Sequence, residues 1–80
     1  MSRRLIMFTG PNCAACDTMK PLVEPLNDVE IISVMDQPLL AQTYGIRGGL
    51  PVFIKIVDGN FNDRMDGAVS KRVLDKWRNS

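Results

Sequence analysis

The two cysteines of this chain constrain its fold more than any other feature, because they lie three residues apart as Cys13-Ala14-Ala15-Cys16. They follow a short apolar run at residues 5–8 and open a stretch with helical periodicity. Side chains three positions apart on a helix share one face, with Cβ atoms about 5–6 Å apart. A disulfide requires Cα atoms about 4.4–6.8 Å apart. The two sulfurs can therefore join or separate with little backbone movement.

The place of the pair at the start of a helix also favours thiol chemistry. A helix N-terminus carries partial positive charge and unpaired N–H groups, which stabilise a thiolate, the nucleophile of disulfide exchange. Cys13 is nearer the loop and is the expected attacking residue, while Cys16, one turn further along, is expected to resolve the mixed disulfide. Asp17 adds a negative charge near both sulfurs, so we expect it to raise the pKa of Cys13.

Composition limits the class of protein. The chain has 80 residues, 45% hydrophobic and 24% charged, as is typical of a globular protein. This predicts one domain, residues 1–80, and we expect a monomer. The net charge of +1 gives no reason to expect nucleic acid or an anionic membrane as partner. With no histidine and no third cysteine, no metal site within the chain is expected.

Two alternatives to a redox pair remain from the residues alone. One is a zinc ion shared between two chains, and the other is an inert structural disulfide, although its loop is too small to stabilise the fold much. The apolar runs are far shorter than the roughly 20 residues of a membrane helix. Arg3 and Arg4 precede an apolar run, as in a signal peptide, but Gly10-Pro11 ends that run early. We therefore expect a cytoplasmic protein.

The apolar pattern alternates between strand and helix periods. It predicts strands at residues 4–9, 30–35, 51–57 and 61–65, and helices at residues 13–27, 38–44 and 70–78. Pro21 and Pro25 should kink or shorten the first helix. Asp36 is a possible cap of the second helix, and Ser70 is the expected cap of the third.

The order β-α-β-α-β-β-α predicts an α/β fold. The first two strands are joined through a helix and should be parallel, whereas the last two should form a hairpin at Asp58-Gly59-Asn60. Three helices then flank a mixed four-stranded sheet. On the last helix, Val73, Leu74 and Trp77 should form the buried face. The cysteines follow the carboxyl end of the first strand, where open α/β sheets commonly hold their sites.

An early strand, a C-x-x-C pair opening a helix, and a later proline at the start of a strand resemble the thioredoxin and glutaredoxin superfamily. Further matches extend along nearly the whole chain. Pro21 stands where thioredoxins carry a helix-kinking proline, and Pro51 stands at the place of the cis-proline. The segments at residues 44–48 and 66–71, Tyr-Gly-Ile-Arg-Gly and Asp-Gly-Ala-Val-Ser-Lys, resemble thioredoxin sequences before the cis-proline and before the last helix.

The chain departs from both branches of the superfamily. It has the size of a glutaredoxin, and Met7 is apolar, as in glutaredoxins, where thioredoxins place a buried carboxylate. Gly49-Leu50-Pro51 replaces the glutaredoxin Thr-Val-Pro, and the paired glycine and acidic residue that help hold glutathione are absent near Gly67. The resemblance is therefore to a minimal thioredoxin-like protein, of the type known from bacteria and bacteriophages.

The resemblance implies a thiol-disulfide oxidoreductase that reduces protein disulfides, including those of ribonucleotide reductase, with no bound cofactor beyond its own redox-active disulfide. It implies that Leu50 and Pro51 bind an extended substrate, that Gly67 forms the floor of this groove, and that Ala14 and Ala15 lie beside it. Electrons would come from thioredoxin reductase and NADPH or from glutathione. A glutathione-dependent glutaredoxin and a thioredoxin-fold binding module with incidental redox activity remain the alternatives.

Overall fold

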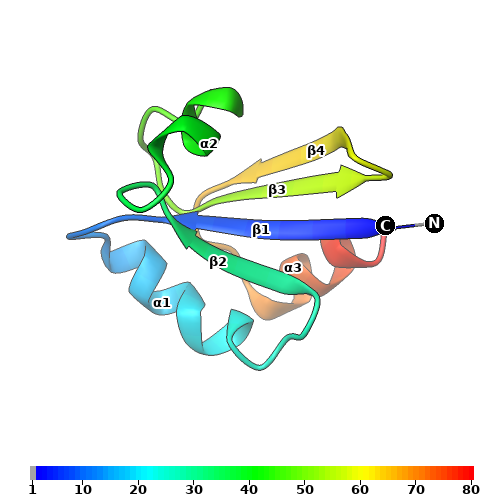
Figure 1. Cartoon of the computed structure of the whole chain (residues 1–80). Helices are drawn as coiled ribbons and strands as arrows, with labels where there is room; N and C mark the ends of the chain where they lie inside the picture. Colours follow the sequence, from blue (N-terminus) through cyan, green and yellow to red (C-terminus); the bar gives the residue numbers. More distant parts are fainter. Residues whose placement is uncertain (1) are drawn as a thin grey trace.

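The computed structural model describes residues 2–80 and contains a four-stranded sheet with three helices (Figure 1). The predicted order of elements is confirmed. The elements are β1 (Arg3–Thr9), α1 (Ala14–Val23), β2 (Val29–Ser33), α2 (Pro38–Thr43), β3 (Val52–Val57), β4 (Asn60–Asp66) and α3 (Lys71–Arg78).

The sheet is mixed, with the strand order β2-β1-β3-β4. Strand β1 pairs in parallel with β2 and antiparallel with β3, and β3 forms a hairpin with β4, as predicted. Asp58 and Gly59 form the hairpin turn with φ values of 51° and 82°. Two successive residues with positive φ match the right-handed twist of the strands that they join.

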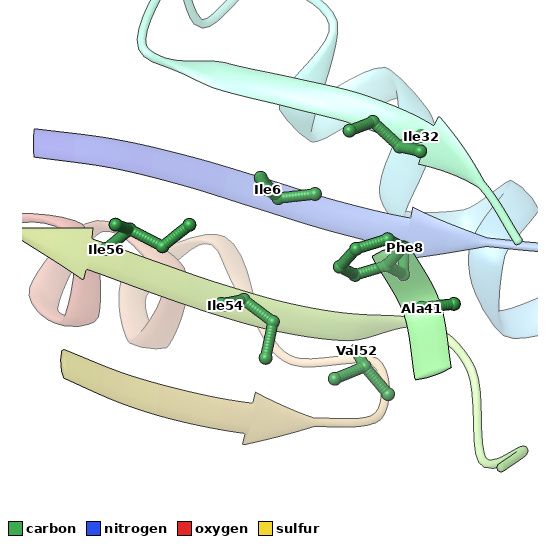
Figure 2. Packing of buried hydrophobic residues seen from close by; sticks show 7 residues of the cluster. All are labelled: Ile6, Phe8, Ile32, Ala41, Val52, Ile54 and Ile56. Carbon is green, nitrogen blue, oxygen red and sulfur yellow. The ribbon is translucent and has the colours of Figure 1, made fainter. Parts of the chain in front are cut away.

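Helices cover the two faces of the sheet unequally. On one face, Met19 and Val23 of α1 and Leu74 of α3 pack with Met7 and Phe53. On the other face, the short helix α2 contributes Ala41 to a cluster of strand residues (Figure 2), whose members are Ile6, Phe8, Ile32, Val52, Ile54 and Ile56. Because β1 and β3 are covered on both faces, they are apolar at successive positions rather than at alternate ones.

Three of the predicted boundaries need correction. Helix α1 ends at Val23 rather than at residue 27, because Pro25 has no N–H to continue the helical hydrogen bonds beyond the C-cap, Glu24. Strand β2 begins one residue earlier and ends at Ser33, after which the chain turns with the N–H groups of Asp36 and Gln37 donating to the Ser33 carbonyl. The predicted cap Asp36 is wrong: Gln37 is the N-cap of α2, and no side chain caps this helix.

Helix α3 begins as predicted and packs slightly differently. The Ser70 hydroxyl accepts a hydrogen bond from the Val73 N–H at 3.2 Å. Leu74 is fully buried, but Val73 was wrongly assigned to the buried face, since 46% of it is exposed. Trp77 is half-buried, and its indole packs edge-on against Phe53.

Lys55 is a buried charge that the sequence pattern did not single out, because it lies in an otherwise apolar strand. Its Nζ donates to the Trp77 carbonyl and to the Ser80 hydroxyl, and it lies 4.8 Å from the centre of the Trp77 ring. Burial lowers the pKa of this ammonium group, although nearby Asp63 opposes the shift. Lys55 thus ties β3 to the end of α3. Among residues 2–80, no helix is long and apolar enough to cross a membrane.

Candidate active site

The two cysteines form a disulfide at the start of α1, directly beyond the carboxyl end of β1. Their Cα atoms are 5.2 Å apart, within the range that the spacing predicts. Cys13 is the N-cap of the helix in extended backbone, and the Cys16 N–H donates to Cys13 Sγ at 3.1 Å. This places a helix N-terminus, with its partial positive charge, at the sulfur of Cys13.

The two sulfurs differ in their exposure to solvent. Cys16, in the first turn of α1, has no exposed surface, whereas Cys13 is only half-buried. Ala14 is exposed and Ala15 half-buried, so the residues between the cysteines add little bulk around the reachable sulfur. Cys13 therefore presents surface to solvent, and Cys16 presents none.

The loop before β3 lies directly against the disulfide. The Leu50–Pro51 peptide bond is cis, and the Leu50 carbonyl oxygen is 3.5 Å from Cys13 Sγ. In the disulfide this sulfur has no proton to donate, so the approach is a packing contact. The Gly67 N–H donates to the Pro51 carbonyl at 2.8 Å, which fixes the segment before α3 beside the same loop. Cys13, Leu50, Pro51 and Gly67 are therefore brought together.

Glycines shape this loop in two different ways. Gly48 and Gly49 have φ values of 138° and 65°, which other residues rarely adopt, and nothing lies within 4 Å of a Cβ built on either. Gly10 is required for space instead, since a Cβ there would lie 2.7 Å from Leu50 Cδ1 and 3.4 Å from Val34 Cγ2. The sequence did not predict the contacts of Gly10 with Leu50 and Val34. The turn signal at residues 10–12 was enough by itself to explain a glycine at position 10.

Charged groups near the cysteines are sparse. Met7, at the position of the thioredoxin carboxylate, is fully buried on the face that α1 covers. The Asp17 side chain is 77% exposed, and its nearest cation is Lys20 at 3.9 Å. Asp66, next to Gly67, is held ionised by Arg64, whose hydrogen bond keeps the pKa of that carboxyl below its usual value. No negative group is buried with the sulfurs in the part of the chain that the structure describes.

We searched the described residues for side chains that could hold a metal ion. Residues 2–80 contain no group of three histidine, cysteine or acidic side chains placed to hold a metal ion. The cysteine pair itself is the redox group, and the disulfide that it forms is the oxidised state of that group.

The fold and the site together define a class of protein. The chain has the thioredoxin fold and carries a C-x-x-C disulfide after the first strand, opposite a cis-proline loop. No protein-family model and no curated protein matches the chain by sequence. Solved structures of thioredoxins, however, superpose on nearly all of it.

Three of these structures show the extent of the likeness. A thioredoxin mutant from Halobacterium salinarum has 25% identity and a TM-score of 0.79, and the match covers 94% of this chain and 70% of that one. For Malassezia sympodialis thioredoxin the identity is 25%, the TM-score 0.81 and the coverage 96% and 73%. Fasciola hepatica thioredoxin has 25% identity and a TM-score of 0.78, and the match covers 96% of this chain and 79% of that one. The fold and the cysteine pair support thiol-disulfide oxidoreductase activity.

Proposed function

We propose that this protein reduces disulfide bonds in other proteins by dithiol exchange. The difference in exposure between its two sulfurs carries this proposal: Cys13 is half-buried at the helix N-cap, and Cys16 has an exposed fraction of 0%. The attacking thiol must be reachable by a bulky substrate, whereas the resolving thiol must reach only its neighbour. This arrangement suits Cys13 to the first role and Cys16 to the second.

The reaction starts from the reduced protein. The Cys13 thiolate attacks one sulfur of the substrate disulfide, so a Cys13–substrate bond forms, the substrate bond breaks, and the leaving sulfur takes up a proton. Cys16 then loses its proton and attacks Cys13 Sγ, which forms the intramolecular disulfide and releases the second substrate thiol. Two electrons pass to the substrate in each cycle.

The substrate segment would lie in extended form across the Leu50–Pro51 loop, with Gly67 as the floor of the groove and Ala14 and Ala15 beside it. The exposed backbone of Gly48 and Gly49 and the contact of the Leu50 carbonyl with Cys13 Sγ support this placement. The physiological substrate would be a protein with an accessible disulfide, such as ribonucleotide reductase. Two cysteines used for catalysis rather than for stapling agree with a reducing compartment such as the cytoplasm.

Activity and binding are separated by one substitution. Cys13→Ser removes the attacking sulfur and leaves the loop of Leu50 and Pro51 in place. We expect this variant to bind an extended partner and to lose reduction of a disulfide-containing test protein. If the unaltered protein binds partners but reduces no disulfide, the protein is a binding module and the proposal is wrong.

Return to the dithiol state requires a two-electron donor. We propose thioredoxin reductase with NADPH, because the Tyr44-Gly45-Ile46-Arg47-Gly48 segment is similar to that of thioredoxins. The apolar Met7 favours glutathione as the second candidate. Reduction of the Cys13–Cys16 disulfide should be followed with each donor separately; fast reduction by glutathione alone would make the protein a glutaredoxin.

A further inference from the structure

A hollow that is distinct from the groove at Leu50 and Pro51 lies on the α2 side of the sheet. It has a volume of about 390 Å³ and is bounded by the end of β2, by α2 and by the loop that follows it. Its apolar wall consists of Val34, Ala41 and Ile46, and its polar wall of Gln42 and Arg47. The proposed reaction uses none of these residues.

Val34, which lines the hollow, lies near Leu50, whose carbonyl contacts Cys13 Sγ. The Gly10 position has Leu50 on one side and Val34 on the other, so the two side chains lie close together there. Leu50, Val34 and Ile46 also pack against the same core cluster. An extended chain advances about 3.3 Å per residue, so a segment held at Leu50 would reach the hollow within about two to four residues.

The charged residue in the lining of the hollow is Arg47. Arg47 is exposed and forms no ion pair or side-chain hydrogen bond within residues 2–80, unlike Arg3, Arg4, Arg64 and Arg78. Met35 and Leu39, which directly follow the lining residues Val34 and Pro38, are 70% and 77% exposed. A free guanidinium in the lining of a hollow that also contains Val34, Ala41 and Ile46 suits an apolar residue that is accompanied by a carboxylate.

From this placement we infer that the hollow selects protein substrates with an aliphatic residue and an acidic residue close to the reactive cysteine. The aliphatic side chain enters between Val34, Ala41 and Ile46, and the carboxylate accepts from the Arg47 guanidinium. The occupant is a segment of the substrate protein, and the inference rests on the proposed reductase function. Arg47 acts here as a specificity-determining residue and takes no part in the exchange of sulfur bonds.

The test uses single-turnover reduction of synthetic peptide disulfides by the fully reduced 80-residue chain. The peptides differ only in whether Leu-Asp or Leu-Lys stands near the reactive cysteine, and uncharged 2-hydroxyethyl disulfide serves as the reference substrate. The unaltered protein should prefer the aspartate peptide. Arg47→Gln should lower that second-order rate constant about threefold to fivefold, toward the upper end of what an exposed ion pair contributes. The loss should shrink at high salt.

Two further variants locate the effect. Arg72→Gln removes one positive charge from an exposed α3 residue that forms no ion pair within residues 2–80, and it should leave the peptide preference unchanged. Gln42→Trp fills the hollow from an exposed position and should slow both leucine peptides about threefold or more. Neither variant should alter the rate with 2-hydroxyethyl disulfide.

The outcomes that overturn the inference are distinct from failure of the proposed function. Equal rates for the two peptides, or equal losses in Arg47→Gln and Arg72→Gln, would show that Arg47 does not select substrates. If 2-hydroxyethyl disulfide itself is not reduced, the reductase function is wrong, and the inference falls with it.

Discussion

The two cysteines are chemically identical, and their different environments come from one step along the chain. Cys13 precedes the first helical turn, so its sulfur accepts the Cys16 N–H and remains partly open to solvent. Cys16 lies within that turn and has no exposed surface. A thiolate at Cys13 would gain from both the N–H donor and the helix dipole. The helix start alone therefore accounts for the different environments of the two sulfurs.

Asp17 should oppose this stabilisation. Its carboxylate lies in the first turn of α1 and is 77% exposed, so solvent screens it but does not remove its effect on a nearby thiolate. We expect Asp17→Asn to lower the pKa of Cys13, because it removes a negative charge from the first turn of the helix that begins at this cysteine.

Thiolate absorbance of the reduced protein, titrated with pH, measures this shift. Glu24→Gln is the matched control, since it removes the same charge beyond the far end of α1. An unchanged or higher pKa of Cys13 in Asp17→Asn would contradict the prediction.

The sequence predicted some residues of the site and not others. The cysteine spacing and the position of the pair after an apolar strand predicted a pair that can form a disulfide at the start of a helix, because this depends on local geometry. Contacts between Gly10, Val34 and Leu50 join segments far apart in the sequence, and no local pattern encodes them. Lys55 escaped notice for the same reason, since its partners come from the end of α3.

Among the elements, α3 depends most on its cap. It has eight residues, too few to be stable alone, and its first turn is held by the Ser70 hydroxyl. Ser70→Ala should lower the free energy of unfolding by about 1 kcal/mol, because an N–H group loses its acceptor. Ser70→Asp keeps an acceptor and should retain most of the stability. Urea denaturation measures both variants; equal losses would contradict the role of the cap.

The β1–β2 pair carries an ion pair that makes stability depend on pH. Arg4 Nε lies 2.6 Å from Glu30 Oε1, and this hydrogen bond lowers the pKa of Glu30. A carboxyl with a lowered pKa in the folded state contributes stability above its unfolded pKa, and loses it as pH falls through the folded pKa. Both side chains are about half exposed, so solvent screening reduces the contribution to about 0.5 kcal/mol.

Glu30→Gln should therefore destabilise the protein slightly at pH 7 and have less effect at an acidic pH below the folded-state pKa of Glu30, where the carboxyl is protonated. Urea midpoints at the two pH values measure this difference. Glu24→Gln, which removes a carboxylate that forms no ion pair in the described chain, is the control. A constant difference between Glu30→Gln and the unaltered protein at both pH values would be contrary to expectation.

Element types were predictable, whereas element ends were less so. Apolar periodicity separated strands from helices because one period is two residues and the other is 3.6. The ends depend on competing local bonds. The N–H groups of Asp36 and Gln37 donate to the Ser33 carbonyl and form a turn, which ended β2 early and left Asp36 outside the cap position.

At the scale of the whole molecule, the two ends of the sheet differ in their surface contacts. The end that holds the cysteines has an exposed loop, a hollow and few ion pairs. At the other end, Asp28 pairs with Arg3 at 3.4 Å and with Arg78 at 2.8 Å, and the Arg3 guanidinium also donates to the Arg78 carbonyl. These contacts join the start of β1, the segment before β2 and the end of α3 at the end of the sheet away from the cysteines.

The core on the α1 and α3 face should decide whether the molecule folds. Leu74 is fully buried there and is the main anchor of α3 on the sheet. Leu74→Ala should cost about 2–5 kcal/mol through lost burial and the cavity that remains. Its neighbour Val73 is 46% exposed, so Val73→Ala should cost much less. Urea unfolding compares the two variants; similar losses would show that α3 is not anchored through Leu74.

The central claim is that Cys13 attacks and Cys16 resolves, and trapping of the mixed disulfide tests it most directly. Each reduced single-cysteine variant, Cys16→Ser and Cys13→Ser, is mixed with a disulfide-containing test protein and analysed by intact mass under non-reducing conditions. We expect Cys16→Ser to accumulate a covalent complex through Cys13, and Cys13→Ser to form almost none, because Cys16 is buried. A complex that forms equally or preferentially with Cys13→Ser would contradict the account.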